Sequence, residues 1–156
     1  MDIDLAVRMT TADIASLVRA VEDRFYVSET MVRDAVTASS SFNLIDSESP
    51  YKVDIFVLGD GELDRRQLSR RRSVTIELDG DSIEIWIGST EDQILRKLTW
   101  FDEGGQVSDR QWRDIVGMLV AQTGHFDEVD LRATAVRLDL EDLLQRALED
   151  SYRQMR

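Results

Sequence analysis

The segment 51–58 carries apolar side chains at both its odd and its even positions, with one acid, Asp54, in its middle. Side chains of a strand alternate between two faces, so Ile55 lies on one face while Asp54 and Phe56 share the other. A strand that is apolar on both faces is typical of a sheet interior. An acid in that setting requires a partner. The chain is therefore expected to build a sheet around this segment and to place a partner near Asp54.

The N-terminal segment 1–7 adds two aspartates, Asp2 and Asp4, to one face of a second strand. At the usual rise per residue their Cα atoms are about 6.6 Å apart. If this strand pairs in register beside the first, Asp54 joins them, and three carboxylates demand a cation such as Mg²⁺. The alternative is that Asp2 belongs to a frayed terminus and that Asp4 is an edge-strand charge that discourages aggregation.

Composition narrows the chemistry that the chain can perform. Its 156 residues are 42% hydrophobic, which suits one compact domain. It has no cysteine, and His125 is its single histidine, so thiolate and multi-histidine metal sites are excluded and acid chemistry rests on carboxylates. No apolar run reaches the length of a membrane span, and no signal peptide opens the chain. We therefore expect a cytoplasmic protein with no membrane partner.

The net charge of −12 argues against adhesion to nucleic acid over the whole surface. Residues 64–73 nevertheless contain five arginines. This stretch could hold a triphosphate or a nucleic acid, but pairing with nearby carboxylates is the favoured interpretation in so acidic a protein.

Hydrophobic periodicity predicts an α+β fold, with a mixed sheet and helices followed by a helical part. We treat residues 1–156 as a single domain, with residues 1–88 forming the sheet half and residues 89–156 a helical half that shares its core. The expected helices include one with an apolar stripe from Ile14 to Phe25, and residues 73–87 are expected to form a hairpin. The expected helix caps are Thr10 or Thr11, Ser28, Ser89 or Thr90, Ser108, Asp127 or Asp130, and Asp139.

Three parts of the chain, in this order, carry a resemblance to a known family. They are Asp2-Ile-Asp-Leu, Lys52-Val-Asp-Ile-Phe, and the helical pair 90–100 and 108–115. Over most of its length the chain resembles a nucleotidyltransferase-like family of the DNA polymerase β superfamily, which includes minimal nucleotidyltransferases and toxin-like proteins of abortive-infection systems. The first part is similar to the family's Asp-x-Asp metal strand, the second to the strand with the third carboxylate, and the third to the helices after the catalytic sheet.

The resemblance implies Mg²⁺-dependent transfer of a nucleoside monophosphate from a nucleoside triphosphate to a hydroxyl of a protein, an RNA or a small molecule. It implies that Asp2 and Asp4 bind Mg²⁺, with Asp54 as the third ligand or as the base for the attacking hydroxyl.

The same resemblance places Lys97, Arg110 and Asp114 near the phosphates. Lys97 and Arg110 would bind the nucleotide, and Lys97 and Asp114 would take part in catalysis together with Asp54. Each has a simpler alternative. Lys97, at the border of an apolar stripe, could extend its ammonium to water, and Arg110 could pair with Asp114 one turn away.

Family members carry a Gly-Ser or Gly-Gly segment before the aspartates that holds the triphosphate, and this sequence starts at the aspartates. We therefore expect impaired transfer by this chain. We also expect the strand of Asp2 to expose an edge and apolar surface, which predicts a homodimer. The alternative function is a non-catalytic dimeric interaction module, or a toxin–antitoxin type partner with a degenerate nucleotidyltransferase fold.

Overall fold

The computed structural model describes residues 2–78 and 80–156. For Asp2 it describes the backbone alone. Helices and two small sheets alternate along these residues, so the predicted α+β class is confirmed. The chain divides into two compact units, one ending at Asp64 and the other beginning at Arg65. The predicted single domain with a shared core stays a prediction.

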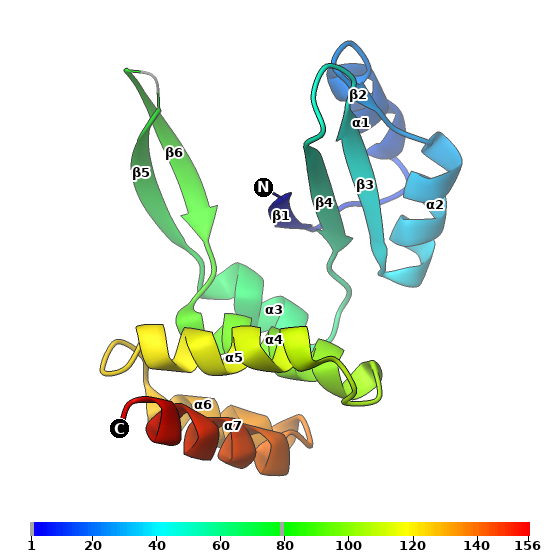
Figure 1. Cartoon of the computed structure of the whole chain (residues 1–156). Coiled ribbons are helices and arrows are strands. Elements are labelled where there is room, and N and C mark those ends of the chain that lie inside the picture. The colour runs from blue at the N-terminus through cyan, green and yellow to red at the C-terminus, as the bar shows by residue number, and fades with distance from the viewer. Residues whose placement is uncertain (1, 79) are drawn as a thin grey trace. The chain divides into compact units, whose positions relative to one another are not determined.

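The first unit is a four-stranded sheet with two helices packed on it (Figure 1). The strand order is β1-β4-β3-β2; β1 runs parallel to β4, and the other two pairs are antiparallel. The elements are β1 (Asp2–Val7), α1 (Ile14–Val21), β2 (Phe25–Tyr26), α2 (Glu29–Ala38), β3 (Ser41–Asp46) and β4 (Lys52–Val57).

The core of this unit lies between α1, α2 and one face of the sheet, because Phe42 and Leu44 alternate with exposed residues on β3. The members of this core are Ile14, Val32, Ala35, Phe42, Leu44, Ile55 and Val57. Ile3 and Leu5 of the edge strand β1 point to the same side but stay 48% and 46% exposed. The helices therefore cover the middle of the sheet and leave its β1 edge uncovered.

Two expectations for the first helix are wrong. Neither Thr10 nor Thr11 is its cap, because Asp13 precedes the helix and its carboxylate accepts hydrogen bonds from the Thr10 amide and hydroxyl, at 2.7 and 2.8 Å. The helix also ends at Val21, and Phe25 belongs to β2, where it pairs with Asp46. The apolar spacing continued past the helix end because Phe25 packs against the same core from a strand.

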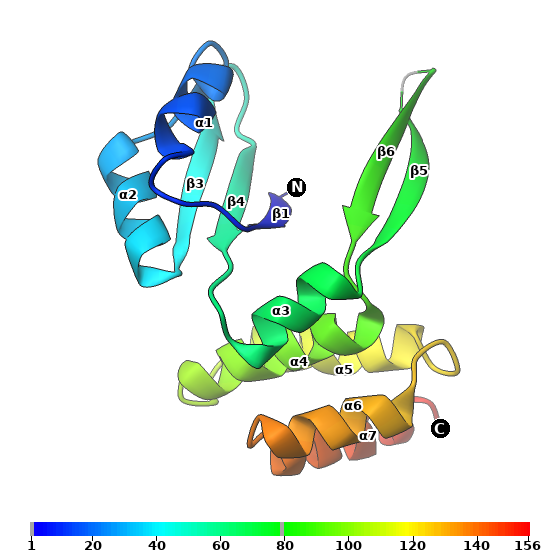
Figure 2. The same cartoon turned by 180° about the vertical axis from the view of Figure 1, so that it is seen from behind.

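The second unit joins a hairpin to a bundle of helices. α4 and α5 form one layer and α6 and α7 the other, as the two opposite views show (Figures 1 and 2). The elements are α3 (Glu62–Ser69, which spans the boundary), β5 (Arg72–Leu78), β6 (Asp81–Ile87), α4 (Thr90–Glu103), α5 (Asp109–Ala121), α6 (Glu128–Arg137) and α7 (Glu141–Gln154). None of the helices in the described residues is long and apolar enough to cross a membrane.

Most of the predicted caps in this unit are confirmed. The side chains of Ser89, Ser108 and Asp127 each accept a hydrogen bond from a backbone N–H three residues later, as Ser28 does at α2. Asp139 is not the cap of the last helix. Its φ of 57° places it in the left-handed region, whereas an N-cap residue is typically extended. Leu140 precedes α7 instead and makes no side-chain cap.

Candidate functional site

Three oxygen-bearing side chains form a row across the uncovered face of the first sheet. Asp4 of β1 pairs with Asp54 of β4, and Asp54 pairs with Asn43 of β3 on its other side. Paired residues on neighbouring strands point to the same face, and the strands lie about 4.8 Å apart. Asp4 and Asn43 are exposed, and Asp54 is half-buried between them. The register that the metal-site hypothesis requires of Asp4 and Asp54 is therefore present.

Lys52 supplies the countercharge that the central aspartate requires. Its ammonium donates to both carboxylate oxygens of Asp54, at 3.0 and 2.7 Å. The side chain of Lys52 is 40% exposed, and that of Asp54 is 19% exposed. The two residues are two positions apart on one strand and so share a face. This partner is one of the two lysines in the chain, and the i, i+2 spacing was the signal for it.

Apolar side chains flank the polar row on the same face. Phe56 lies two residues beyond Asp54 on β4, and Ile45 of β3 pairs with Lys52. Tyr26 of β2 pairs with Ile45 and is 66% exposed. The middle of this face thus presents carboxylate and amide oxygens and one ammonium. The rings of Tyr26 and Phe56 beside them form an aromatic margin.

Mg²⁺ binding at Asp4 and Asp54 stays a prediction, and it would need a ligand to complete the metal's coordination. No group of three or more acids or other metal-binding side chains in residues 2–78 and 80–156 is placed to hold a metal by itself. Mg²⁺, however, is commonly held by one or two carboxylates together with substrate phosphates, and Asp4 and Asp54 provide two carboxylates. The β1 backbone aligns Asp2 with Lys52, but the Asp2 side chain lies outside the described residues.

The other predicted site residues lie in the second unit. Lys97 is half-buried on α4, next to the fully buried Leu98. Arg110 and Asp114 are exposed one turn apart on α5, and within the described ranges no hydrogen bond or ion pair joins them. The alternative that Arg110 and Asp114 pair with each other stays a prediction. Their proximity to Asp54 stays a prediction, because they belong to different units.

Trp112 of α5 packs within the helical bundle. Its ring centroid lies 5.0 Å from that of Phe101, and the Arg146 guanidinium lies 4.2 Å from the ring. Its indole N–H donates to Asp150 at 3.0 Å. With a ring, a cation and a carboxylate around it, Trp112 is used as a structural residue.

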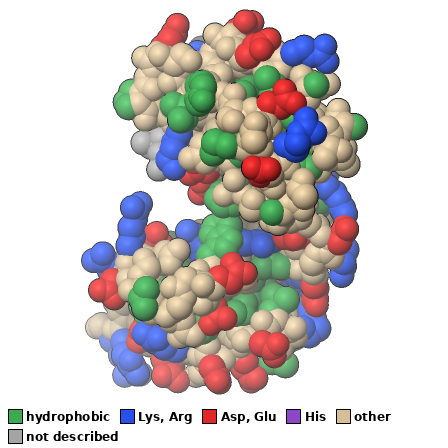
Figure 3. All heavy atoms as spheres, turned by 90° about the vertical axis from the view of Figure 1, so that its right-hand side faces the viewer, with side chains coloured by type: hydrophobic (Ala, Val, Ile, Leu, Met, Phe, Trp, Pro, Cys, Tyr) green, Lys and Arg blue, Asp and Glu red, His purple; other side chains and the backbone are tan. Residues whose placement is uncertain are grey.

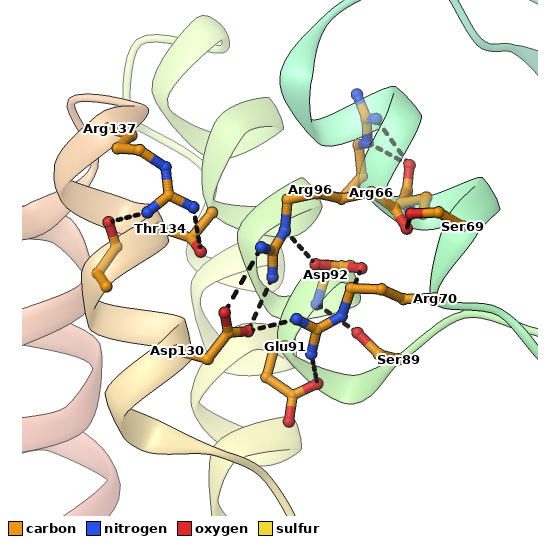
Figure 4. Close-up of polar contacts among 12 residues, drawn as sticks. Arg66, Ser69, Arg70, Ser89, Glu91, Asp92, Arg96, Asp130, Thr134 and Arg137 are labelled. Carbon is orange, nitrogen blue, oxygen red and sulfur yellow. Dashed lines mark hydrogen bonds and ion pairs between the residues drawn. The ribbon is translucent and has the colours of Figure 1, made fainter.

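Arg66 and Arg70 of the arginine-rich stretch 64–73 pair with carboxylates. Arg66 of α3 donates to Asp92 of α4 at 3.0 Å and to Asp130 of α6 at 2.8 Å, and Arg70 donates to Asp130 at 2.7 Å (Figure 4). Arg70 also lies 3.4 Å from Glu91 and 3.6 Å from the second oxygen of Asp92, which is completely buried. These arginines therefore join α3 to the bundle.

On the side drawn in Figure 3, acidic and basic side chains are interspersed, with hydrophobic ones among them. Comparisons with protein-family models, with curated proteins and with solved structures found no match.

Proposed function

We propose that the chain is a nucleotidyltransferase-like protein, with Mg²⁺-dependent transfer of a nucleoside monophosphate to a hydroxyl acceptor as its chemistry. The single observation that supports this proposal most strongly is the in-register pairing of Asp4 and Asp54 on parallel strands, on the face that the helices of their unit leave open. Two carboxylates on adjacent strands repel each other unless a cation lies near them. Lys52 at present neutralises one of the two.

In this proposal, Asp4 and Asp54 hold the metal ion, and Asn43 offers an amide oxygen beside them. When bound, Mg²⁺ would neutralise charge on the phosphates and orient them for in-line attack. The aromatic margin of Tyr26 and Phe56 would contact the base. Lys52 would move from Asp54 to a phosphate, because its flexible ammonium binds phosphate as a point charge. Lys97 and Arg110 are proposed as phosphate contacts by the resemblance alone.

The proposal is tested by following transfer of label from α-labelled nucleoside triphosphates in the presence of Mg²⁺ and cell extract. We expect labelled acceptor with the unmodified chain and a loss of at least about 100-fold in Asp4→Asn and Asp54→Asn. Asp34→Asn is the matched control. It removes the same charge from an exposed position on α2, which packs on the opposite face of the sheet.

A direct measurement of metal binding separates a site without turnover from no site at all. Mn²⁺, counted by electron paramagnetic resonance in the presence of a non-hydrolysable triphosphate, should bind to the unmodified chain and to Asp34→Asn and should be lost in Asp54→Asn. Binding that is equal in all three proteins would contradict the proposed site. Far-UV circular dichroism of each variant shows that its helices are intact.

A second candidate function is a non-catalytic dimeric interaction module. The observation that favours it is the hairpin of the second unit, whose apolar face is only partly covered. Tight partner capture with no transfer of label would favour this module over the enzyme.

A further inference from the structure

The hairpin β5–β6 has one almost entirely aliphatic face. The register pairs Val74 with Ile85 and Ile76 with Ile83, so these four side chains point to one side. Leu78 extends this face at the tip of the hairpin, and Ile87 extends it at the base. The opposite face carries Ser73, Thr75, Glu77, Ser82, Glu84 and Trp86.

Within its own unit, this face is poorly covered. Ile76, Ile83 and Leu78 are 37%, 40% and 55% exposed, whereas Val74, Ile85 and Ile87, nearer the helices, are half-buried. The hairpin packs chiefly strand against strand, and both views show it extending away from the helices of its unit (Figures 1 and 2). A two-stranded hairpin alone is marginally stable in water and needs more strands or a packed apolar face. The aliphatic face is therefore expected to pack against another surface, which would cover it.

Charges at the two ends of the face indicate what the cover is. Arg72 stands at its base, opposite Ile87, and Asp81 stands at its tip, opposite Leu78. Both side chains are exposed. They are separated by six positions of strand, or about 20 Å, so they cannot pair within one hairpin.

We infer that the aliphatic faces of two copies of this hairpin pack on each other across a two-fold axis, with the tip of one hairpin over the base of the other. This arrangement is isologous, since the same aliphatic residues meet in both directions. It brings Arg72 of each copy to the end where Asp81 of the other lies, which makes two oppositely charged pairs. Sheets that pack face to face lie about 10 Å apart, which aliphatic side chains from both sides fill.

The reverse orientation, base over base, is disfavoured for two reasons. It places Arg72 beside a second Arg72 and Asp81 beside a second Asp81, and like charges at an interface repel. It also brings the two helical bundles, which are attached at the bases, to the same end of the paired hairpins. The tip-over-base arrangement separates the bundles and matches the charges.

The test is the oligomeric state of the full chain by sedimentation equilibrium. We expect a dimer at tens of micromolar, and an increase in its dissociation constant of at least about tenfold in Ile83→Lys, since a charge is then buried in the aliphatic face. Thr75→Lys is the matched control. It adds the same charge on the polar face of the same hairpin and should leave the dissociation constant within about twofold.

Charge reversal tests the orientation. Arg72→Asp and Asp81→Arg should each weaken the dimer several-fold, because each creates like-charged pairs, and the double variant should restore the unmodified dissociation constant. Because Arg72 and Asp81 are too far apart to pair within one copy, recovery of the dissociation constant in the double variant would have to come from contacts between copies. Single reversals that have no effect, or a double variant that remains weak, would overturn the tip-over-base pairing.

A monomer at 100 µM would overturn the proposal as a whole. If amide hydrogen exchange of β5 and β6 were strongly protected in such a monomer, another part of the same chain would be the cover. If Ile83→Lys lost its helical circular dichroism, Ile76→Ser would replace it, since it weakens the same face without adding a charge. This inference does not depend on the proposed nucleotidyl transfer.

Discussion

The ammonium of Lys52 lies 2.7 and 3.0 Å from the two carboxylate oxygens of Asp54, two residues away on the same strand. This ion pair occupies the centre of the face where a divalent cation is proposed to bind. A bound cation and the Lys52 ammonium would therefore compete for the same carboxylate.

Replacing Lys52 by glutamine is expected to strengthen divalent-cation binding. The change removes the competing charge and keeps both carboxylates, so the affinity for Mn²⁺ without nucleotide should rise by about threefold to tenfold, a modest gain because the ammonium is partly exposed to solvent. Isothermal titration measures it. Asp54→Asn should change the affinity in the opposite direction, and Arg33→Gln, on exposed α2, should leave it unchanged. A fall in affinity with Lys52→Gln would contradict competition at this site.

Removing the buried carboxylate of Asp92 is expected to cost far more stability than removing an exposed one. Asp92→Ala leaves the Arg66 guanidinium, whose side chain is 16% exposed, with one carboxylate fewer, and the expected loss is about 3–5 kcal/mol in the free energy of unfolding. Urea unfolding followed by circular dichroism measures it. The control is Glu29→Ala, which breaks an exposed i,i+4 pair with Arg33 and should cost no more than about 0.5 kcal/mol.

A small loss of unfolding free energy in Asp92→Ala would show that the ion pairs around Arg66 and Asp92 are solvated and do not stabilise the bundle. Exchanging the charges for apolar groups is a further check. The variant with Arg66→Met and Asp92→Leu should recover much of the loss, because no buried charge is then left without a partner.

The sequence was sufficient to predict features that depend on short-range periodicity. The alternation of β4 fixed which residues share its faces, the β5–β6 hairpin followed from two alternating segments around a Gly80 turn, and the caps at Ser89 and Ser108 followed from their spacing to the helices. Each of these signals is complete within a few residues.

Features that depend on distant residues could not be predicted. The two-residue strand β2 forms because Phe25 pairs with Asp46, and α3 forms in a stretch with little apolar periodicity because Arg66 reaches carboxylates on α4 and α6. Asn43 joined the candidate site only through the register of β3 on β4. Likewise, no change in amino-acid composition indicates the boundary between the two units at Asp64.

Replacing Asp139 by glycine and replacing it by alanine are expected to change the stability of the chain in opposite directions. Asp139 has a φ of 57°, in the turn between α6 and α7, where glycine is favoured because it has no Cβ. Asp139→Gly should therefore stabilise the chain by up to about 1 kcal/mol. Asp139→Ala should destabilise it by a similar amount, because alanine lacks the short polar side chain that lets aspartate adopt a positive φ. Thermal unfolding of the pair measures both. A gain with alanine would show that this turn changes its conformation in solution.

The carboxylates of the cluster in Figure 4 predict how stability depends on pH. Burial by itself raises the pKa of Asp130, but hydrogen bonds and the charges of Arg66 and Arg70 outweigh it and hold the pKa below its ordinary value. Burial also raises the pKa of Glu91, but hydrogen bonds from the amide of Asp127, from its own amide and from Ser89, together with the charge of Arg70, outweigh burial and hold the pKa below its ordinary value. Both acids therefore bind a proton more readily in the unfolded chain than in the folded one.

A lowered folded-state pKa means that the stabilisation is fully present above the unfolded-state pKa, near 4 for Asp and Glu, and is lost as the pH falls through the folded-state value. The free energy of unfolding should thus be nearly constant from pH 7 to about pH 5.5 and should decline below about pH 4.5. Urea titrations at half-unit intervals measure this decline. Asp130→Asn should make it shallower, whereas Asp34→Asn, at an exposed position, should leave it unchanged. A decline of the same steepness in all three proteins would show that the cluster of Arg66 and Arg70 does not cause the acid sensitivity.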